Sequence, residues 1–206
     1  APSVLVVDSE GNPVSGVNVS VSASGEGLAP GSALSGSTDS NGVAEFGNLI
    51  IETVNTYTLT FSIDAAGVAA VQSGTFSILA AGGDPSLTDA SVPNGVAGDE
   101  TVISITVRDA FGNLVTGASG LLSVNVSGAN NASAAISETG NGIYSAAYTP
   151  LASGTDNISI AFNGTPISGS PYLSNVTTSQ IDGTVSSVIA SPQSVVVGNS
   201  SQVTIQ

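Results

Sequence analysis

The chain has 206 residues, of which 41% are hydrophobic and only 8% are charged, and 15 carboxylates against one basic residue give a formal net charge of −14. Binding to nucleic acid or to an anionic membrane surface depends on Lys and Arg, so this composition excludes both. His and Cys are absent, which excludes Ser-His-Asp and Cys-His catalysis, His-based zinc sites and disulfides, and we predict that the protein is not an enzyme.

Short β-strands are predicted along the whole chain. Apolar residues alternate with hydroxyl-bearing ones, most clearly in residues 17–22, 57–62, 103–107 and 158–162, and turn residues interrupt them about every eight to twelve positions. Each strand then has one apolar face and one polar face, as in a sheet that packs on one side. No apolar run approaches about 18 residues, so no membrane insertion is expected. We predict an all-β fold of tandem immunoglobulin-like β-sandwiches arranged as a rod.

Two copies of one unit are indicated by repeated turns. The segment Asp8-Ser-Glu-Gly-Asn-Pro-Val resembles Asp109-Ala-Phe-Gly-Asn-Leu-Val at an offset of 101 residues. Later in each unit, Asp39-Ser-Asn-Gly and Glu138-Thr-Gly-Asn-Gly place an Asn-Gly turn before a strand, which is a strong hairpin signal. Such regular spacing is typical of an array of stacked units. The short segment 80–86, rich in Gly and small residues, is the predicted joint between them.

The two ends of the chain complement each other. The C-terminal residues 197–206 resemble residues 97–106, whereas residues 1–7 correspond to 102–108, so the first unit begins within its second strand. Two explanations stay open at this point: the chain is a piece of a longer array, or it is a subunit whose terminal strands complete the next molecule by strand complementation. The expected partners are copies of itself or adjacent Ig-like repeats, and the candidate inserting residues are Val195, Val197, Val203 and Ile205.

Several segments carry a family resemblance. Residues 6–17, 38–46 and 56–61 resemble bacterial Ig-like repeats of the invasin and intimin type in surface adhesins, whereas residues 107–113, 141–150 and 162–172 resemble a filamin-type Ig repeat. The resemblance implies sandwiches that act as rod segments, without the actin-binding domain of filamin. We therefore expect an Ig-like sandwich lacking its first strand at 1–80, a complete filamin-like sandwich at 81–180, and the opening strands of a further unit at 181–206.

The acidic residues are compatible with calcium as a cofactor, because Ca²⁺ takes several oxygen ligands. The candidate site is an interdomain one at Asp84 and Asp89, where a bound ion would stiffen the joint. No other cofactor is expected. For Asp8 and Asp109 we favour a turn role instead, in which the carboxylate accepts hydrogen bonds from nearby backbone N–H groups.

The predicted function is a structural one at the cell surface or outside the cell. The chain is expected to be either a stalk segment of a large adhesin or a subunit that assembles head to tail, and the alternative is an Ig-like module that binds a carbohydrate or a receptor. The pattern Asn-x-Ser/Thr marks candidate glycosylation sites in such a protein. They are Asn18, Asn125, Asn131, Asn157, Asn163, Asn175 and Asn199.

Overall fold

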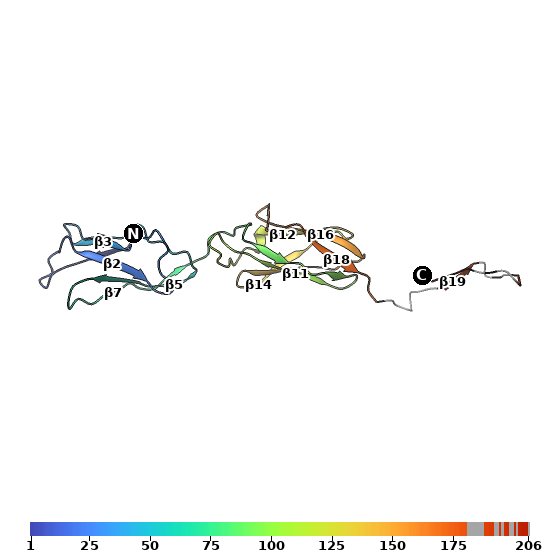
Figure 1. The fold of residues 1–206 in the computed structure, drawn as a ribbon, viewed down its shortest axis with the longest axis horizontal. Coiled ribbons are helices and arrows are strands. Elements are labelled where there is room, and N and C mark those ends of the chain that lie inside the picture. Colours follow the sequence, from blue (N-terminus) through green and yellow to red (C-terminus); the bar gives the residue numbers. More distant parts are fainter. Residues whose placement is uncertain (181–187, 192–193, 195, 198–199, 201, 206) are drawn as a thin grey trace.

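The computed structural model describes residues 1–180, 188–191, 194, 196–197, 200 and 202–205. Within these residues the secondary structure consists of strands and a single 3₁₀ turn, η1 (Ser119–Leu121), which confirms the predicted all-β class. The core is divided into two hydrophobic clusters, one in each half of the chain, and Figure 1 shows the two sandwiches one after the other along the longest axis. No helix in the described part of the chain is long and apolar enough to cross a membrane.

The first unit contains eight short strands: β1 (Ser3–Leu5), β2 (Asn18–Ala23), β3 (Ser35–Ser37), β4 (Val43–Glu45), β5 (Asn55–Tyr57), β6 (Leu59–Ile63), β7 (Val71–Gln72) and β8 (Phe76–Ile78). They form a four-stranded sheet in the order β3-β2-β6-β7 and two pairs, β1-β4 and β5-β8. The sheet and the β1-β4 pair face each other across the core.

The alternation of apolar and polar residues along the strands produces the core of the first unit. Val19 and Val21 of β2 and Leu59 and Phe61 of β6 are buried, while the intervening Ser20 and Ser62 lie on the exposed face, where their hydroxyl groups are 3.2 Å apart. The ring of Phe61 packs against that of Phe46 at a centroid distance of 5.2 Å and an interplanar angle of 53°, which suits the quadrupoles of aromatic rings. The predicted two-residue period is therefore the actual packing period of this sheet.

The second unit is larger and has longer strands: β9 (Asp89–Ser91), β10 (Gly95–Val96), β11 (Thr101–Thr106), β12 (Leu122–Gly128), β13 (Ala132–Ser133), β14 (Ala135–Gly140), β15 (Ile143–Tyr148), β16 (Gly154–Phe162), β17 (Thr165–Pro166) and β18 (Tyr172–Thr177). One sheet has the order β10-β18-β16-β12-β13, with β17 beside β16, and the other has the order β14-β15-β11-β9. Ile103 and Ile105 of one sheet and Ile158 and Ile160 of the other are almost fully buried between them.

The internal repeat extends to strand register. Ser3 lies opposite Glu45 in the β1-β4 pair, and Ser104, which is 101 residues after Ser3, lies opposite Ser145 in the β11-β15 pair. Gly42 and Gly142 both have a positive φ, of 73° in each case, at the turn that precedes β4 and β15. The two units are thus built on the same plan around these strands.

A separate pair of strands lies near the C-terminus. Strand β19 (Val188–Ser191) pairs antiparallel with β20 (Gln202–Ile205), with Val188 opposite Ile205 and Ala190 opposite Val203. The corresponding segments of the second unit, β9 and β11, also pair antiparallel. The domain boundaries expected from the sequence stay a prediction.

Candidate functional site at the joint between the two units

The joint is organised by the turn at Asp109, whose side chain is only 1% exposed. Its Oδ1 accepts hydrogen bonds from the backbone N–H groups of Phe111 and Asn113, both at 2.9 Å, and its Oδ2 accepts one from Ala81 N at 3.0 Å. The side-chain amide of Asn113 donates to Oδ2 at 3.0 Å. The carboxylate therefore closes its own turn and also fixes the segment that enters the second unit.

These hydrogen bonds keep Asp109 ionised in the folded protein. Burial disfavours the charged carboxylate and by itself would raise its pKa, but the bonds donated by the Asn113 side chain and backbone, Ala81 N and Phe111 N outweigh it. The pKa of Asp109 consequently lies below its ordinary value of 3.8. At neutral pH the buried Asp109 carboxylate is therefore charged, and its amide donors hold it in one position.

Asn113 connects this turn to the first unit. Its Nδ2 donates to the backbone carbonyl of Glu52 at 2.7 Å, and its Oδ1 accepts from Val54 N at 3.0 Å. Because both ends of the amide are used, a rotated side chain would set its NH₂ group against the Val54 N–H and its oxygen against the Glu52 carbonyl. One side chain thus binds to the loop between β4 and β5 in a single orientation.

The linker itself is tightly packed where it meets the second unit. A Cβ atom on Gly83 would lie 2.7 Å from the Phe162 ring and 2.8 Å from Val107 Cγ1, so only glycine fits there. Asp84 N donates to the Arg108 carbonyl at 2.6 Å, which holds the linker along the strand end. Ala81, Gly83 and Asp84 of the linker are therefore all held against the second unit.

The equivalent turn of the first unit has the same internal hydrogen bonds. Asp8 Oδ1 accepts from Glu10 N at 3.0 Å and from Asn12 N at 2.8 Å, and Asn12 Nδ2 donates to Asp8 Oδ2 at 3.1 Å. The bond from the Asn12 side chain is the main reason that the pKa of Asp8 is lowered. The turn role predicted for Asp8 and Asp109 is confirmed. Within the described residues, the contacts that Asn113 makes to another unit have no counterpart at Asn12.

The two candidate calcium ligands lie in different settings. Asp84 Oδ1 accepts from Ser86 N at 2.8 Å and from Ser86 Oγ at 2.7 Å, and these bonds lower the pKa of the Asp84 carboxyl. Asp89 is exposed on β9 opposite Thr106. No group of three His, Cys, Asp or Glu residues that could hold a metal ion occurs in the described part of the chain. The interdomain calcium site stays a prediction.

The candidate glycosylation sites are on the surface wherever the structure describes them. All six described acceptor side chains are exposed: Asn18, Asn125, Asn131, Asn157, Asn163 and Asn175. Asn163 has a φ of 48°, as expected for an asparagine in a tight turn, and Asn199 lies outside the described residues. Exposure is needed for modification, but modification itself stays a prediction.

The predicted strand-complementation residues are only partly described. Val197 is fully exposed, and Val203, on β20, is 60% exposed. Ile205 belongs to β20, opposite Val188, and Val195 lies outside the described residues. Two of the four side chains are therefore known to be accessible, and complementation stays a prediction.

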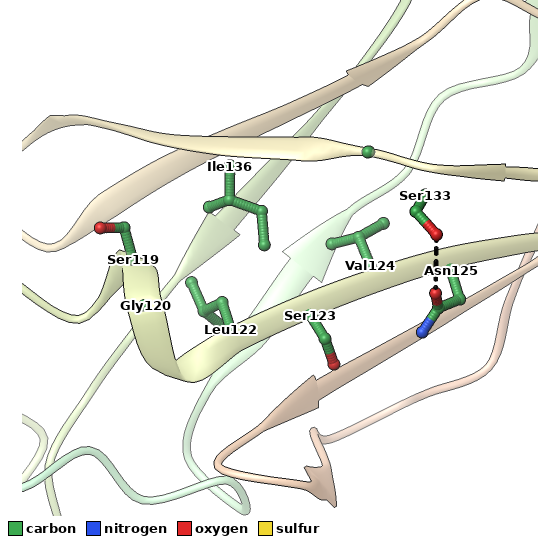
Figure 2. A pocket seen from close by; sticks show the side chains of 9 residues that line it. Ser119, Gly120, Leu122, Ser123, Val124, Asn125, Ser133 and Ile136 are labelled. Atoms are coloured by element: carbon green, nitrogen blue, oxygen red, sulfur yellow. Dashed lines mark hydrogen bonds between the residues drawn. The ribbon is translucent and has the colours of Figure 1, made fainter.

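A shallow hollow of about 400 Å³ lies beside β12 in the second unit, between this strand and the segment that carries β13 and β14. Figure 2 shows Leu122, Val124 and Ile136 pointing into it, and the Ser133 hydroxyl donating to Asn125 Oδ1 at 3.2 Å near one end. Its lining contains no titratable side chain. The hollow provides shape, apolar contact and serine hydroxyl groups, but its lining has no acid or base to activate them.

Comparisons with known proteins agree with this architecture. Residues 82–173 match the family model of the Filamin/ABP280 repeat. InvD of Yersinia pseudotuberculosis is 20% identical, with a TM-score of 0.58 and coverage of 91% of this chain and 56% of that structure. Invasin, described as a bacterial integrin-binding protein, is 21% identical, with a TM-score of 0.50 and coverage of 92% and 38%. FdeC, an Escherichia coli adhesin, is 24% identical, with a TM-score of 0.46 and coverage of 85% and 58%.

The match shows that residues 82–173 are similar to the filamin-type Ig-like repeat, and the likeness to InvD and invasin shows a shared fold. Both resemblances predicted from the sequence are confirmed at that level. No curated protein matches the chain in a sequence comparison. The chain spans between 38% and 58% of the length of the three bacterial structures.

Proposed function

We propose that this chain is a structural, non-catalytic segment of a bacterial surface adhesin, in which adjacent Ig-like sandwiches form a stiff rod. The chemistry of the chain supports this, because the absence of His and Cys from the sequence removes the usual nucleophile and base systems. The folds of InvD and invasin, which share this architecture, support the surface location.

The observation that carries the proposal is the pair of hydrogen bonds that join Asn113 of the second unit to Glu52 and Val54 of the first, here called the Asn113 bridge. Relative domain motion is the default when two domains share a small interface. Here the Asp109 carboxylate and the close packing at Gly83 hold the linker against the second unit, and the Asn113 amide binds the first unit. A stalk needs such a restriction, because a flexible joint would shorten its average reach.

The bridge can be tested with Asn113→Ala, and Asn12→Ala provides a matched control at the equivalent turn of the first unit. Because the chain lacks cysteine, pairs of introduced cysteines, one in each unit, can carry spin labels without background. We expect the distance distribution between the units to be narrow in the wild type and in Asn12→Ala, and clearly broader in Asn113→Ala. Equal widths in all three proteins would contradict the proposed role of the joint.

A further inference from the structure

Arg108 is the only Lys or Arg residue of the chain, and it lies beside the joint, just after β11. Its carbonyl accepts the hydrogen bond from Asp84 N of the linker at 2.6 Å. Its guanidinium Nη1 donates to the carbonyl of Gly112 at 3.0 Å. Arg108 therefore contacts the linker with its backbone and the turn between Asp109 and Asn113 with its side chain. Because a guanidinium is not deprotonated in proteins, this donor does not depend on pH.

The side-chain bond of Arg108 reaches the peptide group that leads into Asn113. The Gly112 carbonyl and the Asn113 N–H belong to one planar peptide unit. Asn113 N donates to Asp109 Oδ1 at 2.9 Å on one side of this unit, and Arg108 binds its carbonyl on the other. Gly112, with a φ of 84° and no Cβ, restricts the unit little by itself. The two bonds together therefore fix the plane of the peptide and the direction in which the Asn113 side chain leaves the backbone.

The equivalent turn of the first unit forms without an arginine. Val7 stands at the position of Arg108, at the same offset of 101 residues that relates the two turns. Gly11 has a φ of 85°, so the turn has the same shape in both units. Asn12 N is bonded to Asp8 Oδ1, but within the described part of the chain the Gly11 carbonyl accepts no hydrogen bond. The arginine is therefore not needed to form the turn, and it occurs at the copy of the turn that contacts another unit.

We propose that Arg108 is a positioning residue of the joint, which holds Asn113 in the orientation that binds the first unit. A connected path runs from the linker through Arg108 and the Gly112 peptide to the Asn113 side chain. The amide continues this path to the Glu52 carbonyl and to Val54 N. Only one orientation of the amide satisfies both partners, so fixing its backbone in advance reduces the conformational entropy that the contact costs.

This inference rests on the proposed function, because it gives Arg108 a part in the Asn113 bridge, but the two can fail separately. The order of the Asn113 side-chain amide is a property of the turn, and it reports the positioning role. The width of the distance distribution between the units is a property of the whole joint, and it reports the stiffness of the rod. Measuring both quantities in the same variants therefore shows which of the two claims is wrong.

The positioning role is tested with Arg108→Val in the full chain, which introduces the residue that the first unit has at this place and should therefore fold. Nuclear magnetic relaxation gives the order parameters of the side-chain amides, and Asn12 is an internal reference in every sample. We expect the Asn113 amide to be more ordered than that of Asn12 in the wild type, and to fall toward the Asn12 value in Arg108→Val with thermal unfolding almost unchanged. Val7→Ala is the matched control and should leave both amides as they are. An unchanged Asn113 amide in Arg108→Val would overturn the proposal.

The spin-label pairs described above show whether Arg108 acts through Asn113. Arg108→Val should broaden the distance distribution toward that of Asn113→Ala, and the double variant should be no broader than Asn113→Ala alone. Additive broadening in the double variant would mean that the arginine acts independently, and the proposal would be wrong. Because the Gly112 carbonyl is neutral, the wild-type width should not grow at high salt; growth would indicate attraction to the carboxylates of the first unit instead. A narrow distribution in Asn113→Ala, together with a less ordered Asn113 amide in Arg108→Val, would contradict the proposed function and support the positioning role.

Discussion

Asn12 and Asn113 occupy the same position in two copies of one turn, but their environments differ. At Asn12 the amide closes a turn around an exposed aspartate, and at Asn113 the same amide also reaches the backbone of Glu52 and Val54. The turn alone explains why an aspartate begins each segment. The additional bonds of Asn113 connect the two units. The connection is therefore made by this side chain and not by the turn, which both units contain.

Gly142 should be among the positions least tolerant of substitution. Its φ is 73°, and an added Cβ would lie 2.8 Å from Val115 N. We expect Gly142→Ala to lower the free energy of unfolding by roughly 2 kcal/mol, from the left-handed backbone conformation and the contact together. Urea denaturation measures this loss. Gly120→Ala is the control, because no atom would lie within 4 Å of its Cβ, and a similar loss there would contradict the explanation.

Asp109 should make stability depend on acid. Its pKa is lower in the folded protein than its ordinary value of 3.8, so the unfolded chain binds the proton more readily. The stabilisation is therefore complete above the unfolded pKa and is lost as the pH falls through the folded pKa. We expect unfolding free energies measured from pH 6 down to about pH 2 to decline less steeply in Asp109→Asn than in the wild type. Parallel profiles would exclude this role of the carboxylate.

At the scale of single elements, much of the structure follows from the sequence pattern. The alternation in residues 57–62 and 158–162 correctly predicts which side chains of β6 and β16 are buried, because a sheet packed on one face has a period of two. The pattern does not predict that β7, β10, β13 and β17 have only two residues each, because strand ends depend on where a neighbour stops pairing.

The connection between β11 and β12 is held by a tyrosine that the strand pattern identifies only as an apolar residue. The buried hydroxyl of Tyr144 on β15 donates to the Val115 carbonyl at 2.8 Å and accepts from Ala118 N at 2.9 Å. Burial raises the pKa of Tyr144, so the hydroxyl keeps its proton. We expect Tyr144→Phe to cost about 2 to 3 kcal/mol, since two buried backbone groups lose their partner. Thermal unfolding measures this, and an unchanged stability would show that the backbone groups find other partners.

At the scale of the whole molecule, the repeat in the sequence predicts two units, but it does not predict how they are joined. From its Gly and other small residues, the segment 80–86 is expected to be a short joint and not a long tether. In the structure, however, Gly83 is a glycine because side chains of the second unit approach closely, and not because the chain bends freely there. Contacts between residues 59 to 61 positions apart, such as those of Asn113 with Val54 and Glu52, depend on tertiary packing and have no local sequence signal.

The central claim is that the two sandwiches are held in one relative orientation. Residual dipolar couplings of the wild-type chain in a weakly aligning medium test it most directly, because they report the orientation of each unit separately. A joint fixed by Asn113 and Asp109 should give both units the same alignment tensor, in magnitude and in direction, after fitting to the structure. Two tensors of different magnitude would mean that the units reorient independently, and the proposed stiff segment would then be wrong.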